Sequence, residues 1–193
     1  MNYNLEYLIK KPRQAIRRGL SIYHRSKEQT ILSDTFIEQT YYPLVRLLKP
    51  NTNLLDIGAS IGDTAIYFSQ FREVEHVYAF ECDRKIWERG AENVKLSPFS
   101  HKISFYNKKA DAEAIKGYLV LGDIAIKCDI EGGEAELFEG LDMKQIYAVI
   151  METHDTKEKM IKLLKDDGFE AEWRFMARGV RFKELGLLIG IKK

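Results

Sequence analysis

The sequence has few cysteines and prolines, almost no net charge and no long apolar run. Its two cysteines, Cys82 and Cys128, are too few for a disulfide framework or a zinc site, so they are expected to be reduced thiols. Every apolar stretch is shorter than the ~18 residues that a membrane-spanning helix needs, and residues 1–4 do not open a secretory signal. These absences predict a cytoplasmic protein without a transmembrane segment.

Charge of neither sign dominates the composition. The 193 residues include 30 basic and 29 acidic side chains, a formal net charge of +1, and 45% of the residues are hydrophobic. This balance is typical of a globular protein with one domain and an extension, and it gives no chain-wide attraction for nucleic acid or acidic lipid. A nucleic-acid partner is therefore not expected from the composition.

The chain is predicted to begin with a helical extension, residues 1–50, followed by one domain, residues 51–193. Apolar positions recur at helical spacing over residues 35–48, where Pro43 is expected to kink or restart the helix and Pro50 to stop it. The extension either packs an apolar stripe on the core or touches an anionic membrane surface or a phosphorylated acceptor. Its basic residues are Lys10, Lys11, Arg13, Arg17, Arg18, Arg25 and Lys27.

After the extension, short apolar runs alternate with amphipathic segments. This alternation predicts a mostly parallel sheet covered by helices on both faces, a three-layer α/β fold of the Rossmann-like kind. The end of the chain predicts an antiparallel hairpin formed by residues 169–175 and 187–191. The other expected strands are residues 54–58, 76–81, 103–106, 124–130 and 148–153.

Residues 54–64 read L-L-D-I-G-A-S-I-G-D-T, an apolar strand end, a turn of small residues and a helix start. A dinucleotide-binding fingerprint would place glycine at Gly58, Ser60 and Asp63, and only the first position carries it. Asp63 and the nearby Asp56 disfavour a pyrophosphate, since like charges about 4 Å apart cost about 4 kcal/mol at an effective dielectric of about 20. The same acids attract the cationic S-adenosylmethionine, so this cofactor is predicted and a dehydrogenase is not.

The next apolar run ends in Glu81, where a βαβ unit delivers an acid to the two hydroxyls of a ribose. Its carboxylate can accept hydrogen bonds from both hydroxyls. The competing interpretation is that Asp56 and Glu81 are polar residues that end two strands and that Asp63 interacts with a helix dipole.

A second group of acids lies in residues 124–134. Alternation along an extended chain would put Asp129 and Glu131 on the same side, and two glycines then allow a sharp turn. The following strand ends in Glu152 and His154, which should lie beside them at the same sheet edge. A general base for methyl transfer to a hydroxyl or amine can be built from these four side chains.

Other interpretations of this group stay open. The four side chains can simply be polar residues exposed at the starts of loops, and Glu134 and Glu136 are interpreted as acids at a helix N-terminus. The carboxylates and His154 could also hold magnesium or manganese, but their spacing is not specific for a metal, and none is predicted.

These motifs resemble the FkbM-type methyltransferases, chiefly through the K-x-D-x-E-G-x-E pattern at residues 127–134. The resemblance extends over about residues 51–170 and includes residues 54–64, 78–83 and 152–154. It implies a class I methyltransferase fold, seven-stranded with one antiparallel strand near the C-terminal edge, that uses S-adenosyl-L-methionine. Members commonly methylate hydroxyl oxygens of sugars or natural products.

The resemblance also implies roles for individual residues. Asp56 would lie near the methionine part of the cofactor, Gly58 beside it and Glu81 on the ribose. Cys82 departs from the family, which often has proline after this acid. The other residues predicted to bind the cofactor are Ala59, Ser60, Gly62, Asp63, Cys82, Ala110, Asp111 and Asp129.

The sequence therefore predicts an O-methyltransferase that acts on a small-molecule or glycan acceptor. Its predicted catalytic residues are Asp129, Glu131, Glu152 and His154. Two alternatives remain: an RNA methyltransferase, which the basic extension favours, and a catalytically silent protein that binds S-adenosylmethionine.

Overall fold

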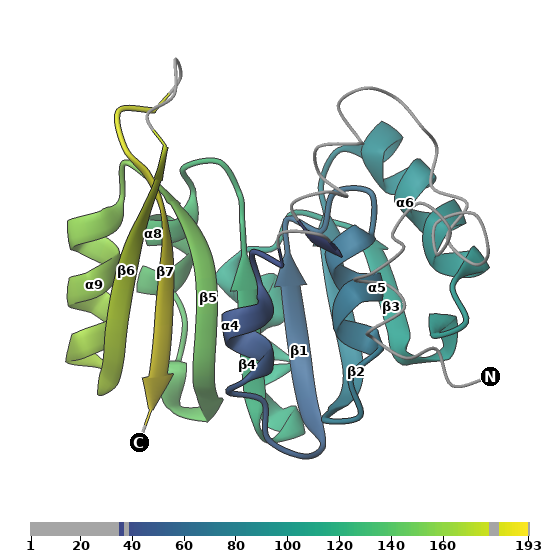
Figure 1. The fold of residues 1–193 in the computed structure, drawn as a ribbon, viewed down its shortest axis with the longest axis horizontal. Helices are drawn as coiled ribbons and strands as arrows, with labels where there is room; N and C mark the ends of the chain where they lie inside the picture. Colours follow the sequence, from purple (N-terminus) through teal and green to yellow (C-terminus); the bar gives the residue numbers. More distant parts are fainter. Residues whose placement is uncertain (1–34, 37–38, 178–181, 193) are drawn as a thin grey trace.

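The computed structural model describes residues 35–36, 39–177 and 182–192. Within these ranges, seven strands form one sheet in the order β3-β2-β1-β4-β5-β7-β6 (Figure 1). β7 runs antiparallel to both of its neighbours, and all other neighbouring pairs are parallel. The strands are β1 (Thr52–Ile57), β2 (Val74–Glu81), β3 (Ile103–Asn107), β4 (Ile124–Cys128), β5 (Ile146–His154), β6 (Phe169–Ala177) and β7 (Leu185–Lys192).

The predicted fold class is confirmed: the sheet is mostly parallel, and a C-terminal antiparallel pair completes it. Every expected strand is present, with ends that differ by a few residues. The strand expected over residues 124–130 is shorter and ends at Cys128. The chain then turns, because Glu131 and Gly132 have left-handed φ values of 59° and 108°. The expectation of an extended chain through Glu131 was therefore wrong.

Helices cover both faces of the sheet. Along β1, Leu54 packs into the apolar core on one face and Leu55 into the core on the other, as alternation in a strand requires. The first core includes side chains of α4 (Tyr42–Val45), α5 (Asp63–Ser69) and α6 (Arg84–Leu96). The second includes side chains of α7 (Ala112–Lys116), α8 (Glu134–Glu139) and α9 (Lys157–Asp166). Short 3₁₀ turns are η1 (Ser100–Lys102), η2 (Leu119–Leu121) and η3 (Met143–Gln145).

The described part of the extension packs on the sheet. The helix expected over residues 35–48 is interrupted: Thr35 and Phe36 are helical, Gln39 has a left-handed φ of 54°, and α4 spans Tyr42–Val45 with Pro43 in its first turn. Proline has no N–H to donate and its φ suits a helix start, so Pro43 restarts the helix as expected. Leu44 is fully buried in the first core. The basic segment predicted at the start of the chain lies outside the described residues.

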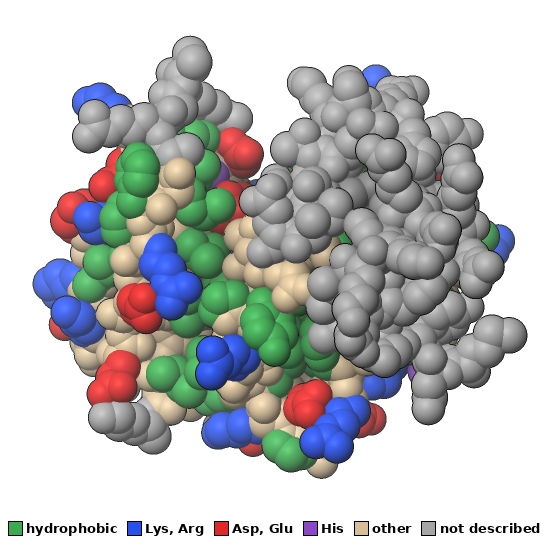
Figure 2. Space-filling view, in the orientation of Figure 1, with side chains coloured by type: hydrophobic (Ala, Val, Ile, Leu, Met, Phe, Trp, Pro, Cys, Tyr) green, Lys and Arg blue, Asp and Glu red, His purple; other side chains and the backbone are tan. Residues whose placement is uncertain are grey.

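Charged side chains of both signs are interspersed over the described part of the face in Figure 2, in keeping with the net charge of +1. Across the described ranges, each helix is too short or too polar to cross a bilayer.

Candidate active site

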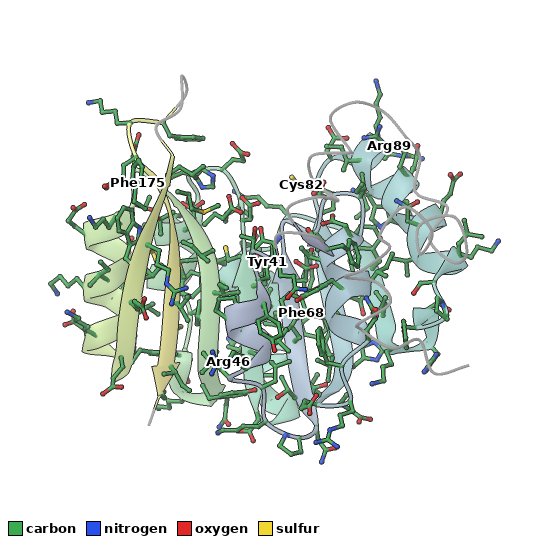
Figure 3. All side chains as sticks on the ribbon, viewed as in Figure 1. Tyr41, Arg46, Phe68, Cys82, Arg89 and Phe175 are labelled. Atoms are coloured by element: carbon green, nitrogen blue, oxygen red, sulfur yellow. The ribbon has the colours of Figure 1, made fainter. Side chains whose placement is uncertain are left out.

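A cavity of about 930 Å³ opens where β1, β2, β4 and β5 end. β1 and β4 are neighbours in the sheet, and the strand order runs outward from them in opposite directions. Ligands of open α/β sheets bind at this switch point, beyond the carboxyl ends of the strands. The volume suits a ligand of cofactor size. Figure 3 shows Tyr41 and Cys82 toward this end of the sheet and Arg46 toward the other.

The turn after β1 brings the backbone close to β4. Gly58 has φ +75°, and a Cβ built on it would lie 1.8 Å from the carbonyl oxygen of Asp129. Only glycine lacks the Cβ that would block this approach. The end of β1 can therefore lie against the end of β4 beneath the cavity. Gly58 and Ser60 line the cavity. Ala59 and Gly62 do not: Ala59 is fully buried, and Gly62 packs against α6.

Glu81, the last residue of β2, is held in place by two backbone donors. The amide of Ser60 donates to its Oε2 at 3.1 Å, and the amide of Asp83 donates to its Oε1 at 2.7 Å. Each carboxylate oxygen keeps a second lone pair, so the group can still accept from two hydroxyls. Glu81 and its neighbour Cys82 both line the cavity. The predicted role of Glu81 as a ribose-binding acid requires this position.

Asp56 lies behind the cavity wall. It is fully buried, accepts a hydrogen bond from the Thr64 hydroxyl at 2.6 Å, and forms an ion pair with Lys127 at 3.2 Å. The Lys127 ammonium also donates to the carbonyl oxygen of Gly58 at 2.7 Å. Burial lowers the pKa of Lys127, but Asp56, Asp129 and Asp63 raise it by more, so the lysine is charged. Asp56 is thus neutralised within the protein.

Lys127 was not predicted from the sequence to be a site residue. A usable signal was present: this lysine lies in the strand I-A-I-K-C, whose other members are apolar. Lysine is almost never fully buried unless it is paired, so a partner carboxylate was to be expected.

Asp63 begins α5 and lines the cavity. It is 2% exposed, and its Oδ2 accepts a hydrogen bond from the Thr35 hydroxyl at 2.6 Å. Its Oδ1 has no hydrogen-bond partner within the described part of the chain. Burial raises the pKa of Asp63 to about 6, which the bond from Thr35 and the charge of Lys127 only partly offset.

We expect Asp63→Asn to increase stability at pH 7. Because the folded-state pKa of Asp63, about 6, exceeds the ordinary aspartate pKa of 3.8, stability is lost as the pH rises between these values. Each pKa unit is about 1.4 kcal/mol, so the amide should raise the free energy of unfolding by roughly 2–3 kcal/mol at pH 7. Denaturant titrations at pH 7 and pH 4 measure this difference, which should vanish at the lower pH.

The matched control for this experiment is Asp123→Asn, since that aspartate is exposed and pairs with the surface lysine Lys49 at 3.5 Å. Its stability should change little at either pH. A loss of stability in the Asp63 variant at pH 7 would contradict the interpretation.

Two acids and a tyrosine meet at the inner end of the cavity. Asp129, Glu152 and Tyr41 line it, and the Tyr41 hydroxyl donates to Glu152 Oε1 at 2.8 Å. Burial and the charge of Asp129 raise the pKa of Glu152 to about 7. Burial also raises the pKa of Asp129, which Lys127 and His154 offset only in part. Burial and the same acids raise the pKa of Tyr41, which stays protonated and acts as the donor.

His154 lies behind Asp129 and does not line the cavity. Its Nδ1 is 2.8 Å from Glu134 Oε1, and its Nε2 is 3.8 Å from Asp129 Oδ1. Burial lowers the pKa of His154, but Glu134 and Asp129 raise it by more. Glu134 is in the first turn of α8, as expected of a helix N-terminal acid, but it is also fully buried. Its role as the partner of His154 was not predicted.

The remaining predicted residues divide between the cavity edge and the loop after β3. Glu131 is exposed at the cavity edge, and its φ of 59° replaces the extended backbone that was expected. Ala110 and Asp111 line the cavity, and Asp111 caps α7 by accepting from the amide of Ala114 at 2.7 Å. The structure thus brings together most of the predicted cofactor residues at the cavity, with Asp56, Ala59 and Gly62 outside its lining. Of the predicted catalytic residues, Asp129, Glu131 and Glu152 line the cavity and His154 does not.

No family model and no curated protein matches the sequence. Solved structures do match the fold. Precorrin-6y C5,15-methyltransferase from Geobacter metallireducens has a TM-score of 0.62 and 16% identity, over 81% of this chain and 90% of that chain. TrmK from M. capricolum, in complex with S-adenosyl-homocysteine, has a TM-score of 0.61 and 17% identity, over 79% of this chain and 66% of that chain.

A third similar structure is described as a candidate tRNA methyltransferase from Streptococcus pneumoniae, in complex with S-adenosyl-L-methionine. Its TM-score is 0.62 and its identity 17%, over 80% of this chain and 72% of that chain. At such identities the comparison establishes the fold: this chain has the Rossmann-like fold of class I methyltransferases.

Proposed function

We propose that this protein is an S-adenosylmethionine-dependent methyltransferase, of the kind that its K-x-D-x-E-G-x-E motif resembles. The observation that carries the proposal is the charge of the cavity. Its lining includes eight carboxylates and three lysines, and one of those lysines, Lys127, is paired with Asp56. Such a lining favours a cationic ligand over a pyrophosphate. The carboxylates belong to Asp63, Glu81, Asp111, Glu113, Asp129, Glu131, Glu136 and Glu152.

The residues present fit this cofactor. Glu81, with both oxygens positioned by backbone amides, would accept from the ribose hydroxyls, and Gly58 leaves room for close approach of the backbone. Ala110 and Asp111 would border the adenine. The cofactor supplies an electrophilic methyl group on a sulfonium. The protein then needs chiefly to place the acceptor and to exclude water.

Asp129 and Glu152 are the groups proposed to act on the acceptor. Their carboxylates face the cavity near the ends of β4 and β5, within reach of one another. Either can hold the acceptor hydroxyl by a hydrogen bond and take its proton as the methyl group is transferred. His154, bonded to Glu134 behind them, would orient Asp129 and not touch the acceptor.

We propose a small-molecule or glycan hydroxyl as the acceptor, because a cavity of about 930 Å³ has a size typical of small-molecule sites. RNA is the second candidate, favoured by the basic residues of the extension and by one structural neighbour's description as a tRNA methyltransferase. Transfer of a labelled methyl group, assayed with a panel of hydroxyl compounds and with transfer RNA, distinguishes them. Incorporation into RNA that falls steeply with added salt would favour the second candidate.

Glu81→Gln is expected to weaken S-adenosylmethionine binding. Hydrogen bonds to a charged group contribute about 1.5–3 kcal/mol, so the loss of this charge should lower affinity about tenfold to a hundredfold. Isothermal titration calorimetry with S-adenosylmethionine and S-adenosylhomocysteine measures the effect. The matched control is Glu113→Gln, an acid at the cavity edge whose carboxylate faces Lys116 at 3.8 Å.

Cys82 provides an independent readout on the unmodified chain. This thiol is exposed at the cavity edge, whereas Cys128 is buried, so an alkylating reagent should modify Cys82 first. Bound S-adenosylhomocysteine should slow that modification. Wild-type protein that neither binds the cofactor by calorimetry nor protects Cys82 would overturn the proposed function.

A further inference from the structure

A group of ligand-type side chains lies at the inner end of the cavity, where β4 and β5 end. One nitrogen of His154 and one carboxylate oxygen each of Asp129 and Glu152 lie within 4.8 Å of one another. Asp129 and Glu152 line the cavity, and His154 is 5% exposed behind them. Two hard oxygen donors and one imidazole therefore converge on one small volume that opens to the cavity.

The orientation of His154 is fixed by a buried acid outside this group. Glu134 Oε1 lies 2.8 Å from His154 Nδ1, and Glu134 also accepts from the amide of Gly132 at 2.9 Å and the hydroxyl of Thr156 at 3.2 Å. An ionised carboxylate only accepts, so Nδ1 carries the proton in this bond. In the neutral ring, the lone pair is then on Nε2.

His154 Nε2 faces Asp129. The distance to Asp129 Oδ1 is 3.8 Å, which is longer than a hydrogen bond. A buried imidazole nitrogen thus faces the Asp129 carboxylate without a hydrogen bond to it, and the Glu152 carboxylate belongs to the same group. Histidines that bind metals usually have this arrangement, with the second ring N–H donated to a carboxylate.

The carboxylates of the group are also positioned, and the neighbouring cation is committed elsewhere. The buried hydroxyl of Tyr41 donates to Glu152 Oε1 at 2.8 Å and fixes that side chain. Lys127, two residues before Asp129, pairs with Asp56 at 3.2 Å and donates to the Gly58 carbonyl, so its charge offsets that of Asp129 only in part. A divalent cation would balance the charge of the two facing acids.

We propose that Asp129, Glu152 and His154 bind one divalent transition-metal cation of the Mn²⁺ type. One imidazole and two carboxylates suit such a cation better than Mg²⁺, which prefers oxygen ligands alone. Bonds of roughly 2.1 Å place two ligands at most about 4.2 Å apart, so the three atoms need to approach by about half an ångström. Water would complete the coordination. A role in holding the acceptor oxygen rests on the proposed function, whereas binding of the cation does not.

The test is a titration of the full chain, freed of metal by dialysis against a chelator, with manganese chloride. Electron paramagnetic resonance measures free Mn²⁺ and should report one bound ion per chain. His154→Gln and Asp129→Asn are expected to weaken binding about a hundredfold, and Glu134→Gln, which acts through His154, about tenfold. The controls are Glu136→Gln, another acid of the same cavity, and His101→Gln on η1, both of which should bind as the wild type does.

A second measurement needs no variant. Pulsed electron paramagnetic resonance of the Mn²⁺-loaded wild-type chain should detect coupling to an imidazole nitrogen, which carboxylates and water alone do not produce. Absence of a bound ion, or of nitrogen coupling to it, would overturn the proposal.

Calorimetry with S-adenosylmethionine on the same samples separates the two proposals. Cofactor binding without Mn²⁺ binding would reject the metal site alone. Mn²⁺ binding without cofactor binding would reject the proposed function alone.

Discussion

Replacing Lys127 by methionine is expected to lower the free energy of unfolding by about 3–5 kcal/mol. Methionine fits the volume but leaves the fully buried Asp56 carboxylate without its counter-charge at 3.2 Å. It also removes the donor to the Gly58 carbonyl, which the lysine bonds at 2.7 Å. An unpaired charge in the interior costs several kcal/mol, far more than the lysine contributes through packing. Chemical denaturation monitored by circular dichroism measures the loss.

A double variant separates lost pairing from lost packing. Asp56→Asn combined with Lys127→Met removes both charges and retains an acceptor for the Thr64 hydroxyl, which donates to Asp56 at 2.6 Å. This double variant should recover a large part of the stability lost in Lys127→Met. The matched control is Lys159→Met, which breaks a half-exposed pair with Glu139 at 2.9 Å and should change stability little. Equal losses in the single and double variants would refute the ion-pair explanation.

Gly58→Ala is expected to destabilise the protein by about 3–5 kcal/mol and to abolish cofactor binding. The new Cβ would lie 1.8 Å from the carbonyl oxygen of Asp129, whereas real Cβ contacts are essentially never under 3.0 Å. The atom that the Cβ would meet belongs to the backbone, so no rotamer change can move it away. Because φ is +75°, which residues with a Cβ rarely adopt, relaxation of the turn does not relieve the clash either. The ends of β1 and β4 would have to separate by more than an ångström, directly beneath the cavity.

The matched control for this variant is Gly117→Ala at the end of α7. A Cβ there meets nothing within 4 Å, and φ is −65°, so the same chemical change is free of strain. Its stability should be unchanged or increased by about 0.4–1 kcal/mol. Thermal unfolding together with calorimetry against S-adenosylhomocysteine measures both expectations. A Gly58→Ala protein that retains wild-type stability and affinity would show that the turn has another conformation.

Much of the fold was predictable because its signals are local. Apolar runs of strand length alternate with amphipathic segments, and each run becomes a strand within a few residues of its expected ends. The residues that end those runs, among them Glu81, reach the cavity because the carboxyl ends of parallel strands share one edge. Local backbone conformation was less predictable. The left-handed φ of Glu131, a non-glycine residue, ends the extended geometry that strand alternation would continue.

The sequence by itself determined the layers of the fold, the order of its elements and the acids that end its strands, since periodicity and chain order suffice for these. Only the tertiary structure decided which charges neutralise one another. Lys127 pairs with Asp56 because β4 lies beside β1, and Glu134 reaches His154 because α8 starts close to the end of β5. Such partners are far apart in the chain, and their electrostatic interaction depends on distance and burial, which local periodicity does not specify. The tertiary structure therefore placed Asp56 behind the cavity wall and left Asp63, Glu81, Asp129 and Glu152 facing the ligand space.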